Sequence, residues 1–208
     1  RSRHRSMRKA ILHLKQSDPV LAGIIEAVGP CRIRYREPSF DTMARSIIFQ
    51  QLSGRVASVI FDRVAAAACA GGALLPEAIL ALSHEQLRAC GLSNQKARYV
   101  RDLAERTAAG DIQFEILHEL DDHAVTEHLT QVKGVGVWTS QMFLIFALRR
   151  PNVLAVGDLG IRTAMKRAYR MRDLPKPARM EKIAMRWSPW CSVACWYLWR
   201  SLDGAADI

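Results

Sequence analysis

The sequence predicts an all-α protein, and two observations lead to this fold class. Hydrophobic residues recur three and four positions apart along nearly every patterned stretch, which is the spacing of an amphipathic helix. No stretch alternates apolar and polar residues between hairpin turns, as β-strands do. The 208 residues, half of them hydrophobic, suffice for one domain with a real core or for two small lobes.

Helix boundaries can be assigned along the first half of the chain. Arg1–Ser6 is a basic polar stretch that we expect to form a mobile tail. Asp18 can cap a helix that holds Pro19 in its first turn, and Ser39 or Asp41 opens another helix. After residues 50–54, the spacing predicts a helix whose inward face holds four apolar residues: Val56, Val59, Ile60 and Val64.

The second half continues this pattern. Ser83 begins a helix with Gln86 three positions later, which is the capping-box arrangement. Lys96–Ala109 reads as a basic amphipathic helix, and Asp121-Asp122 begins the next one. Val137–Leu148 is apolar almost all round, which predicts a buried central helix. Two tryptophans of the C-terminal region are expected in the core: Trp187 and Trp190.

Composition narrows the function. Thirty Lys and Arg against twenty Asp and Glu give a net charge of +10, which favours polyanionic partners, although a solvated basic surface would give the same count. The five cysteines are scattered and include Cys69, and the pair Cys191 and Cys195, one helical turn apart, fits core thiols better than a metal site. No signal peptide or membrane span is evident, and a reducing cytosolic compartment fits.

One short segment is the strongest indication of chemistry. Gly134 and Gly136 allow a tight turn directly before a helix, whose free N–H groups can bind a phosphate oxygen. A plain turn between helices would look the same. About twenty residues later Asp158 stands at the start of another helix, where a lone acid is either a helix cap or a functional carboxylate.

Five segments, in order from about Asp18 to Trp199, resemble one known family. LTQVKGVGVWTSQ resembles the helix-hairpin-helix motif of the HhH-GPD DNA glycosylases, and VLAVGDLGIR resembles the segment that ends in their catalytic aspartate. PSFDTMARSIIFQQLSGRVASVIFDRV resembles the stretch with the DNA-wedging residue, and GLSNQKARYVRDLA and WSPWCSVACWYLWR also match. The chain resembles the 3-methyladenine DNA glycosylase II (AlkA-like) branch, in a compact form without an N-terminal β-domain.

The resemblance implies a fold and a reaction. It implies the two-lobed all-α HhH-GPD fold as a single domain over residues 1–208, with a middle lobe over about 40–150 and a cleft to a second lobe of N- and C-terminal helices. Asp158 corresponds to the catalytic aspartate, which would stabilise the oxocarbenium-like sugar during hydrolysis. Bifunctional relatives carry a nucleophilic lysine where this chain has Trp138, so the resemblance implies a monofunctional enzyme that uses water. The iron–sulfur cysteine loop of the endonuclease III branch has no counterpart in this sequence.

Further roles follow from the same resemblance. The DNA wedge would be Leu52 or, second, Ser53, beside Gln51, unless Leu52 is ordinary core. The pocket for a flat cationic base would be lined by three residues: Trp138, Met142 and Trp199. The family often has an arginine where this chain has Cys191.

Contacts to the DNA backbone are implied at the hairpin and nearby. They involve Lys133, Gly134, Val135, Gly136, Arg162 and Lys166. The carbonyls of Thr130, Val132 and Val135 correspond to a site for a structural Na⁺ or K⁺, and no other cofactor is required.

We therefore expect a monomeric base-excision-repair glycosylase. It would flip alkylated purines such as 3-methyladenine and 7-methylguanine out of double-stranded DNA and hydrolyse their N-glycosidic bond. We expect it in the cytoplasm, at the nucleoid if the host is a bacterium. Two alternatives stay open at this point: a glycosylase for deaminated bases such as hypoxanthine, and a non-catalytic helix-hairpin-helix protein that binds DNA.

Overall fold

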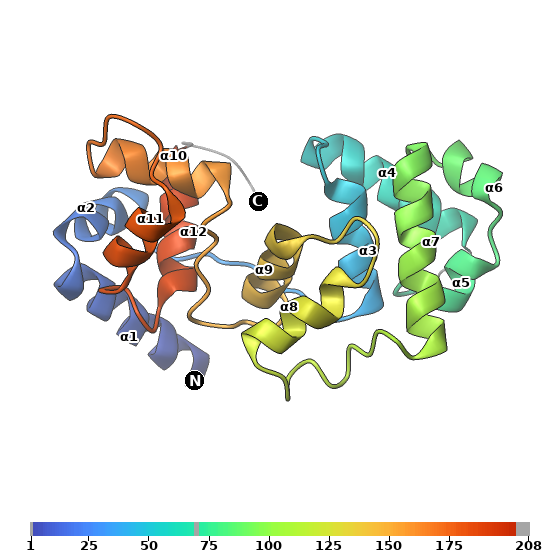
Figure 1. Cartoon of the computed structure of the whole chain (residues 1–208), viewed down its shortest axis with the longest axis horizontal. Helices are drawn as coiled ribbons and strands as arrows, with labels where there is room; N and C mark the ends of the chain where they lie inside the picture. Colours follow the sequence, from blue (N-terminus) through green and yellow to red (C-terminus); the bar gives the residue numbers. More distant parts are fainter. Residues whose placement is uncertain (1, 69–70, 203–208) are drawn as a thin grey trace. The chain divides into compact units, whose positions relative to one another are not determined.

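The computed structural model describes residues 2–68 and 71–202, with the backbone alone for residues 2–5 (Figure 1). Throughout these residues the regular secondary structure is helical, so the predicted all-α class is confirmed. The chain divides into two compact units. Unit 1 combines residues 1–35 with 149–208, and unit 2 covers residues 36–148, whereas the expected middle lobe runs over about 40–150.

Unit 1 is organised around its last helix. Its described helices are α1 (Ser2–Ser17), α2 (Pro19–Val28), α10 (Leu159–Ala168), α11 (Pro177–Ala184) and α12 (Cys191–Leu202). Helix α12 packs against α2, α10 and α1, and each of its residues from Cys191 to Trp199 is buried (Figure 1). An all-round apolar helix in this central position supplies the core on which the shorter helices pack.

The cysteines of α12 behave as core residues, as expected. Cys191 and Cys195 are both buried, and burial raises the pKa of Cys191 to about 11 and that of Cys195 to about 12. Protonated thiols are poor metal ligands, and the described residues contain no cluster of His, Cys, Asp and Glu suited to a metal ion. Cys69 lies outside the described residues.

A buried carboxylate joins three segments of unit 1. Asp18 is fully buried and caps α2, with Oδ1 accepting the Val20 N–H at 2.9 Å. Its Oδ2 accepts the Tyr169 hydroxyl at 2.5 Å and the Trp187 indole N–H at 2.8 Å. Burial and this hydrogen bond raise the pKa of Tyr169, so the phenol stays a donor. The predicted cap is thus also the polar centre of the unit 1 core, and Trp187 is buried as expected while Trp190 is half-buried.

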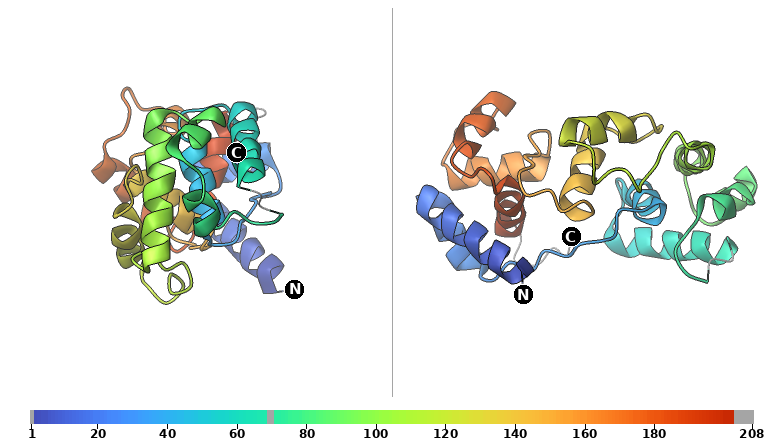
Figure 2. Two further views of the ribbon diagram at one scale, coloured as in Figure 1. Left: turned by 90° about the vertical axis from the view of Figure 1, so that its right-hand side faces the viewer. Right: turned by 90° about the horizontal axis from the view of Figure 1, so that it is seen from below.

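Unit 2 is built on the long helix α7 (Asn94–Ala109), which packs against α3, α5 and α6 (Figure 2). Its other described helices are α3 (Phe40–Phe49), α4 (Gly54–Ala67), α5 (Pro76–Leu80), α6 (His84–Ala89), α8 (Asp122–Thr130) and α9 (Val137–Phe146). Helix α3 also packs against α4, and α8 against α9. The helix starts confirm the predicted caps at three positions: Ser39, Ser83 with Gln86 in a full capping box, and Asp121.

Three expectations about these elements were wrong. Residues 2–6 do not form a tail but lie within α1. Val56 and Val59 of α4 are 48% and 46% exposed, because α4 buries only Ala57, Ile60 and Val64. Helix α9 is not buried along its whole length. Hydrophobic spacing identified the helices, but how wide a face each one buries depends on its neighbours.

The apolar stretches are all short. Helix α9, in which apolar residues occupy most positions, has 10 residues. Among the described residues, no helix combines the length and apolar character that crossing a bilayer requires.

We predict that Asp18→Ala lowers the free energy of unfolding by about 3–5 kcal/mol, because it removes a helix cap and leaves two donors, from Tyr169 and Trp187, without their acceptor. Asp121→Ala is the matched control, since this aspartate is exposed and only caps α8. We expect it to lose about 1 kcal/mol. Chemical denaturation followed by tryptophan fluorescence measures both, and equal losses would contradict the central role of Asp18.

Candidate functional site

Asp158 ends the loop before α10 and is the N-cap of this helix in unit 1. Its Oδ1 accepts the Ile161 N–H at 2.7 Å and the Trp199 indole N–H at 2.8 Å. The residue is only 9% exposed. Two N–H donors, one from the first turn of α10 and one from α12, therefore fix the orientation of a nearly buried carboxylate. Asp158 can therefore cap α10 and serve as a functional carboxylate, because the two roles do not exclude each other.

Gly160 allows this close arrangement. A Cβ atom added to it would lie 3.0 Å from Asp158 Oδ1 and 3.1 Å from Trp199 Cδ1. A larger residue would push the carboxylate and the indole apart. The sequence Gly157-Asp158-Leu159-Gly160 thus has a steric reason for its second glycine.

The loop that leads to Asp158 is fastened to α12. The Ser192 hydroxyl donates to the Arg150 carbonyl at 2.6 Å and accepts the Val153 N–H at 3.0 Å. The Cys195 thiol donates to the Val153 carbonyl at 3.7 Å. Helix α12 therefore fixes the position of Asp158 in two ways. Trp199 binds its side chain directly, and Ser192 and Cys195 bind the backbone of the preceding loop.

In unit 2 the Gly134–Gly136 segment forms the turn between α8 and α9. Gly134 has φ +81°, the left-handed region that favours glycine, and Gly136 is the N-cap of α9. Because Gly136 has no side chain, it cannot satisfy the N–H groups of the first turn of α9 as Asp158 does for α10. An anion is a suitable partner for such a helix start.

Two side chains of α7 contact this turn, one by packing and one by a hydrogen bond. A Cβ atom at Gly134 would lie 2.1 Å from Tyr99 Cδ2, so the aromatic ring packs directly against the turn. The Asp102 carboxylate accepts the Lys133 N–H at 2.9 Å and the Arg106 Nε–H at 3.0 Å. Burial alone would raise the pKa of Asp102, but the Lys133 N–H and the Arg106 guanidinium outweigh it and lower that pKa.

The expected wedge lies in the exposed turn between α3 and α4. Gln51 has φ +56°, a left-handed conformation that costs a residue other than glycine about 1–2 kcal/mol. Leu52 is 38% exposed, so the alternative that it belongs to the core is wrong. Ser53 is exposed and its hydroxyl does not cap α4. A strained turn that presents an apolar side chain to solvent is what a wedge requires.

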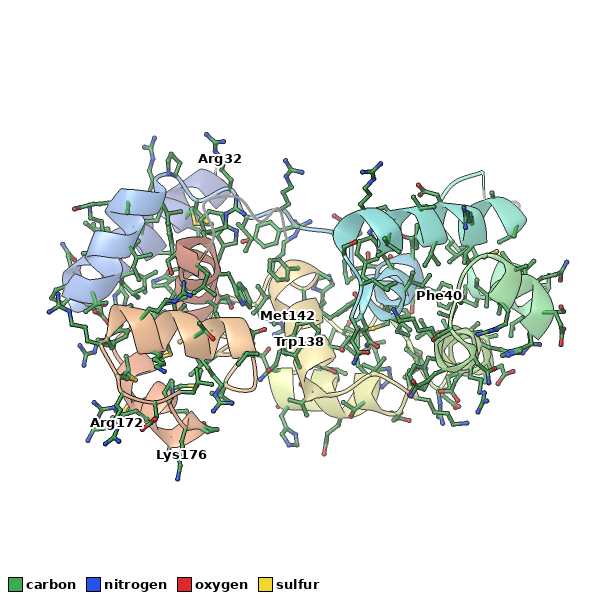
Figure 3. The ribbon with its side chains drawn as sticks, turned by 90° about the horizontal axis from the view of Figure 1, so that it is seen from above. Arg32, Phe40, Trp138, Met142, Arg172 and Lys176 are labelled. Atoms are coloured by element: carbon green, nitrogen blue, oxygen red, sulfur yellow. The ribbon has the colours of Figure 1, made fainter. Side chains whose placement is uncertain are left out.

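The predicted pocket residues come from both units. Trp138 and Met142 lie one turn apart on α9 of unit 2 (Figure 3), and Trp138 is 45% exposed although the helix was expected to be buried. Its exposure follows from its place in the first turn, beside the hairpin. Trp199 belongs to unit 1, where it contacts Asp158.

The predicted phosphate-binding cations have different surroundings. The Lys133 ammonium is 3.5 Å from Asp102 Oδ1, but its side chain is 71% exposed and can still reach a phosphate. The Arg162 Nε–H donates to the Pro175 carbonyl at 3.1 Å, which holds the loop after α10. Two other cations, Arg172 and Lys176, are exposed in that loop (Figure 3). Lys166 is half-buried in the last turn of α10.

The three carbonyls predicted to bind a cation lie at the end of α8 and in the hairpin. Thr130 is the last residue of α8, where helix carbonyls lack intrahelical partners. The Val132 carbonyl accepts the Val135 N–H at 3.1 Å and keeps a second lone pair. Neutral carbonyl oxygens of this kind fit Na⁺ or K⁺ better than a transition metal.

Residues 44–189 match the model of the HhH-GPD superfamily of base excision DNA repair proteins. This match covers most of the chain, including the hairpin, the wedge turn and Asp158. The chain belongs to this family.

Individual members of the HhH-GPD superfamily are similar to this chain in sequence and in structure. The chain is 32% identical to DNA-3-methyladenine glycosylase 1 of Schizosaccharomyces pombe, over 94% of this chain and 88% of that protein. The solved structure of the S. pombe 3-methyladenine DNA glycosylase with abasic DNA has a TM-score of 0.82 and 33% identity, covering 93% of this chain and 96% of that one. A DNA-3-methyladenine glycosidase from Bacillus halodurans also has a TM-score of 0.82, with 34% identity, covering 92% and 88%.

Sequence reasoning missed part of this HhH-GPD site. Gln50 binds the hairpin through its side-chain amide, and Lys96 binds carbonyls at the end of α3, just before the wedge turn. The signal available was the spacing of Lys96, Tyr99 and Asp102, three residues apart, which places them on one face of a helix. That spacing does not say what the face contacts.

We predict that Gly134→Ala destabilises unit 2 by more than about 1–2 kcal/mol, because it forces alanine into the left-handed region and its methyl group overlaps Tyr99. Gly136→Ala is the matched control: its φ is −96°, and a Cβ there has no atom within 4 Å. Denaturant midpoints compare the two. Equal stability of the two variants would show that the turn differs from the one described.

Proposed function

We propose that this protein is a monofunctional DNA glycosylase of base excision repair that releases alkylated purines, such as 3-methyladenine and 7-methylguanine, from double-stranded DNA. The single observation that carries the proposal is the buried Asp158 carboxylate, oriented by Ile161 and Trp199 in an HhH-GPD chain. Relatives named DNA-3-methyladenine glycosylase support the choice of alkylated bases.

Asp158 would act on the sugar. As the N-glycosidic bond breaks, positive charge develops on the deoxyribose, and a fixed carboxylate at its C1′ stabilises that charge. The same group can orient the attacking water. Its two N–H donors, the Ile161 backbone and the Trp199 indole, orient the carboxylate in the absence of substrate.

Water, and not a lysine, would be the nucleophile. The position that carries a lysine in bifunctional relatives holds Trp138, which lies in the exposed first turn of α9. The nearby Lys133 precedes the hairpin glycines and has its ammonium beside Asp102. The expected product is therefore an abasic site in an intact strand.

The flipped base would contact aromatic and thioether groups. On α9, Trp138 and Met142 offer polarisable surfaces to a cationic purine, and a stacking or cation–π contact with the Trp138 ring would be worth roughly 0.5–2 kcal/mol. An alkylated purine already carries positive charge and leaves readily, so the chemistry needs little help from a general acid.

DNA binding would centre on the hairpin. The N–H groups at the start of α9 would receive a phosphate, with Lys133, Arg162 and Lys166 contributing charge. A Na⁺ or K⁺ at the carbonyls of Thr130, Val132 and Val135 would add positive charge beside it, and the reaction needs no other cofactor. We expect a monomer that acts where chromosomal DNA lies, in the nucleoid if the host is a bacterium.

We predict that Asp158→Asn lowers the single-turnover rate of 7-methylguanine release from a defined duplex by at least about 100-fold, because the amide cannot stabilise the developing cation. DNA affinity should stay close to that of the wild-type protein, since asparagine keeps the oxygen that caps α10. Asp173→Asn, at an exposed carboxylate, is the control and should keep full activity. Near wild-type release by Asp158→Asn would refute the mechanism.

We also predict that the reaction leaves the DNA strand uncut. The duplex should break only after alkali treatment, and borohydride should trap no covalent adduct, because no lysine forms an imine. Electrophoresis of the treated and untreated products separates the cases. A nicked strand without alkali would contradict the assignment of a monofunctional enzyme.

A further inference from the structure

One lysine of α7 binds backbone carbonyls just before the wedge turn. The Lys96 ammonium donates to the Ile48 carbonyl at 2.7 Å and also to the Gln50 carbonyl. Lys96 is half-buried, and this burial lowers its pKa. A single cation on α7 therefore binds the end of α3 just before the strained residue Gln51.

Gln50 itself reaches the hairpin. Its Nε2–H₂ group donates to the Gly134 carbonyl at 3.0 Å and to the Thr139 hydroxyl at 3.2 Å. Gly134 lies in the hairpin turn, and Thr139 is a buried residue in the first turn of α9. One side chain thus bridges the wedge turn to both sides of Gly136, where the phosphate is expected.

The same face of α7 that binds the wedge turn also supports the hairpin. Lys96 is followed at intervals of three by Tyr99, whose ring packs against Gly134, and by Asp102, which accepts the Lys133 N–H. The wedge turn and the hairpin are therefore attached to one rigid helix and joined to each other by Gln50. All of these contacts lie within unit 2.

We propose that Gln50 is a positioning residue that couples wedge insertion to phosphate binding at the hairpin. This inference rests on the proposed function. A phosphate bound at the first turn of α9 fixes Gly134 and Thr139, and through them the Gln50 side chain and the base of the wedge turn. The strained turn is then supported when it displaces a base, and insertion in turn favours the hairpin geometry that binds phosphate.

The test uses a duplex with a non-hydrolysable abasic-site analogue beside 2-aminopurine, whose fluorescence rises when stacking is lost. Wild type, Gln50→Ala, Gly136→Ala and the double variant form a cycle for the dissociation constant and for the fluorescence at saturating protein. Gly136→Ala perturbs the phosphate site without an internal clash. Gln50→Glu keeps the shape of the side chain and removes its N–H donors.

Coupling predicts that the two substitutions are not independent. Their combined effect on the dissociation constant should fall short of the product of the single effects by about 5-fold or more. Gly136→Ala should lower the saturating fluorescence in the wild-type background and have no further effect in Gln50→Ala. Gln50→Glu and Lys96→Met should both reduce the fluorescence as Gln50→Ala does.

Gln113→Ala is the matched control, because its side-chain amide also donates to a glycine carbonyl, that of Gly110 at 2.9 Å, which lies in the turn after α7 and in neither the wedge turn nor the hairpin. It should change neither quantity. Simple multiplication of the two effects, or unchanged fluorescence in Gln50→Ala, would overturn the coupling. Release of 7-methylguanine by the same wild-type preparation tests the proposed function separately, because the abasic analogue reports on binding alone.

Discussion

The hydrogen bonds from Ile161 and Trp199 to one oxygen of Asp158 are the interaction on which the rest of unit 1 depends. A carboxylate with 9% exposure is stable in the fold only when donors surround it. Helix α12 must therefore be buried along its length to bring Trp199 to this point, and Gly160 must lack a side chain. The buried Asp18, bound by Trp187, repeats the same solution elsewhere in the unit.

Unit 2 meets a different constraint, because the groups that we propose to bind phosphate there are backbone N–H groups. The position of a backbone N–H group does not depend on its own side chain. It depends on the residues that pack against the turn and bind it. Tyr99 and Asp102 supply that support below the hairpin, and Lys96 supplies it below the wedge turn. The long helix α7 is the common base for both, and it also packs against α3, α5 and α6. Unit 1 therefore orients the Asp158 carboxylate, whereas unit 2 orients the backbone of the hairpin and of the wedge turn.

The sequence predicted what depends on local spacing and not what depends on distant partners. Helix class, the capping box at Ser83 and the cap at Asp18 follow from neighbouring residues, and the structure confirms them. That Tyr169, 151 positions away, would also bind Asp18 could not be read from any local pattern. The bridge from Gln50 to Gly134, across 84 positions, was hidden for the same reason. The exposure of Val56 depends on which helices pack nearby, which periodicity does not report.

The most direct test of the account is the identity of the bases that the purified protein releases from DNA treated with a methylating agent, separated by chromatography. We predict that free 3-methyladenine and 7-methylguanine appear above a control without protein, because a cationic purine is the leaving group that a carboxylate alone can assist. Binding to the same DNA without release of any methylated base would contradict it and would indicate a non-catalytic protein. Release of hypoxanthine alone, from deaminated DNA, would contradict the assignment of alkylated purines.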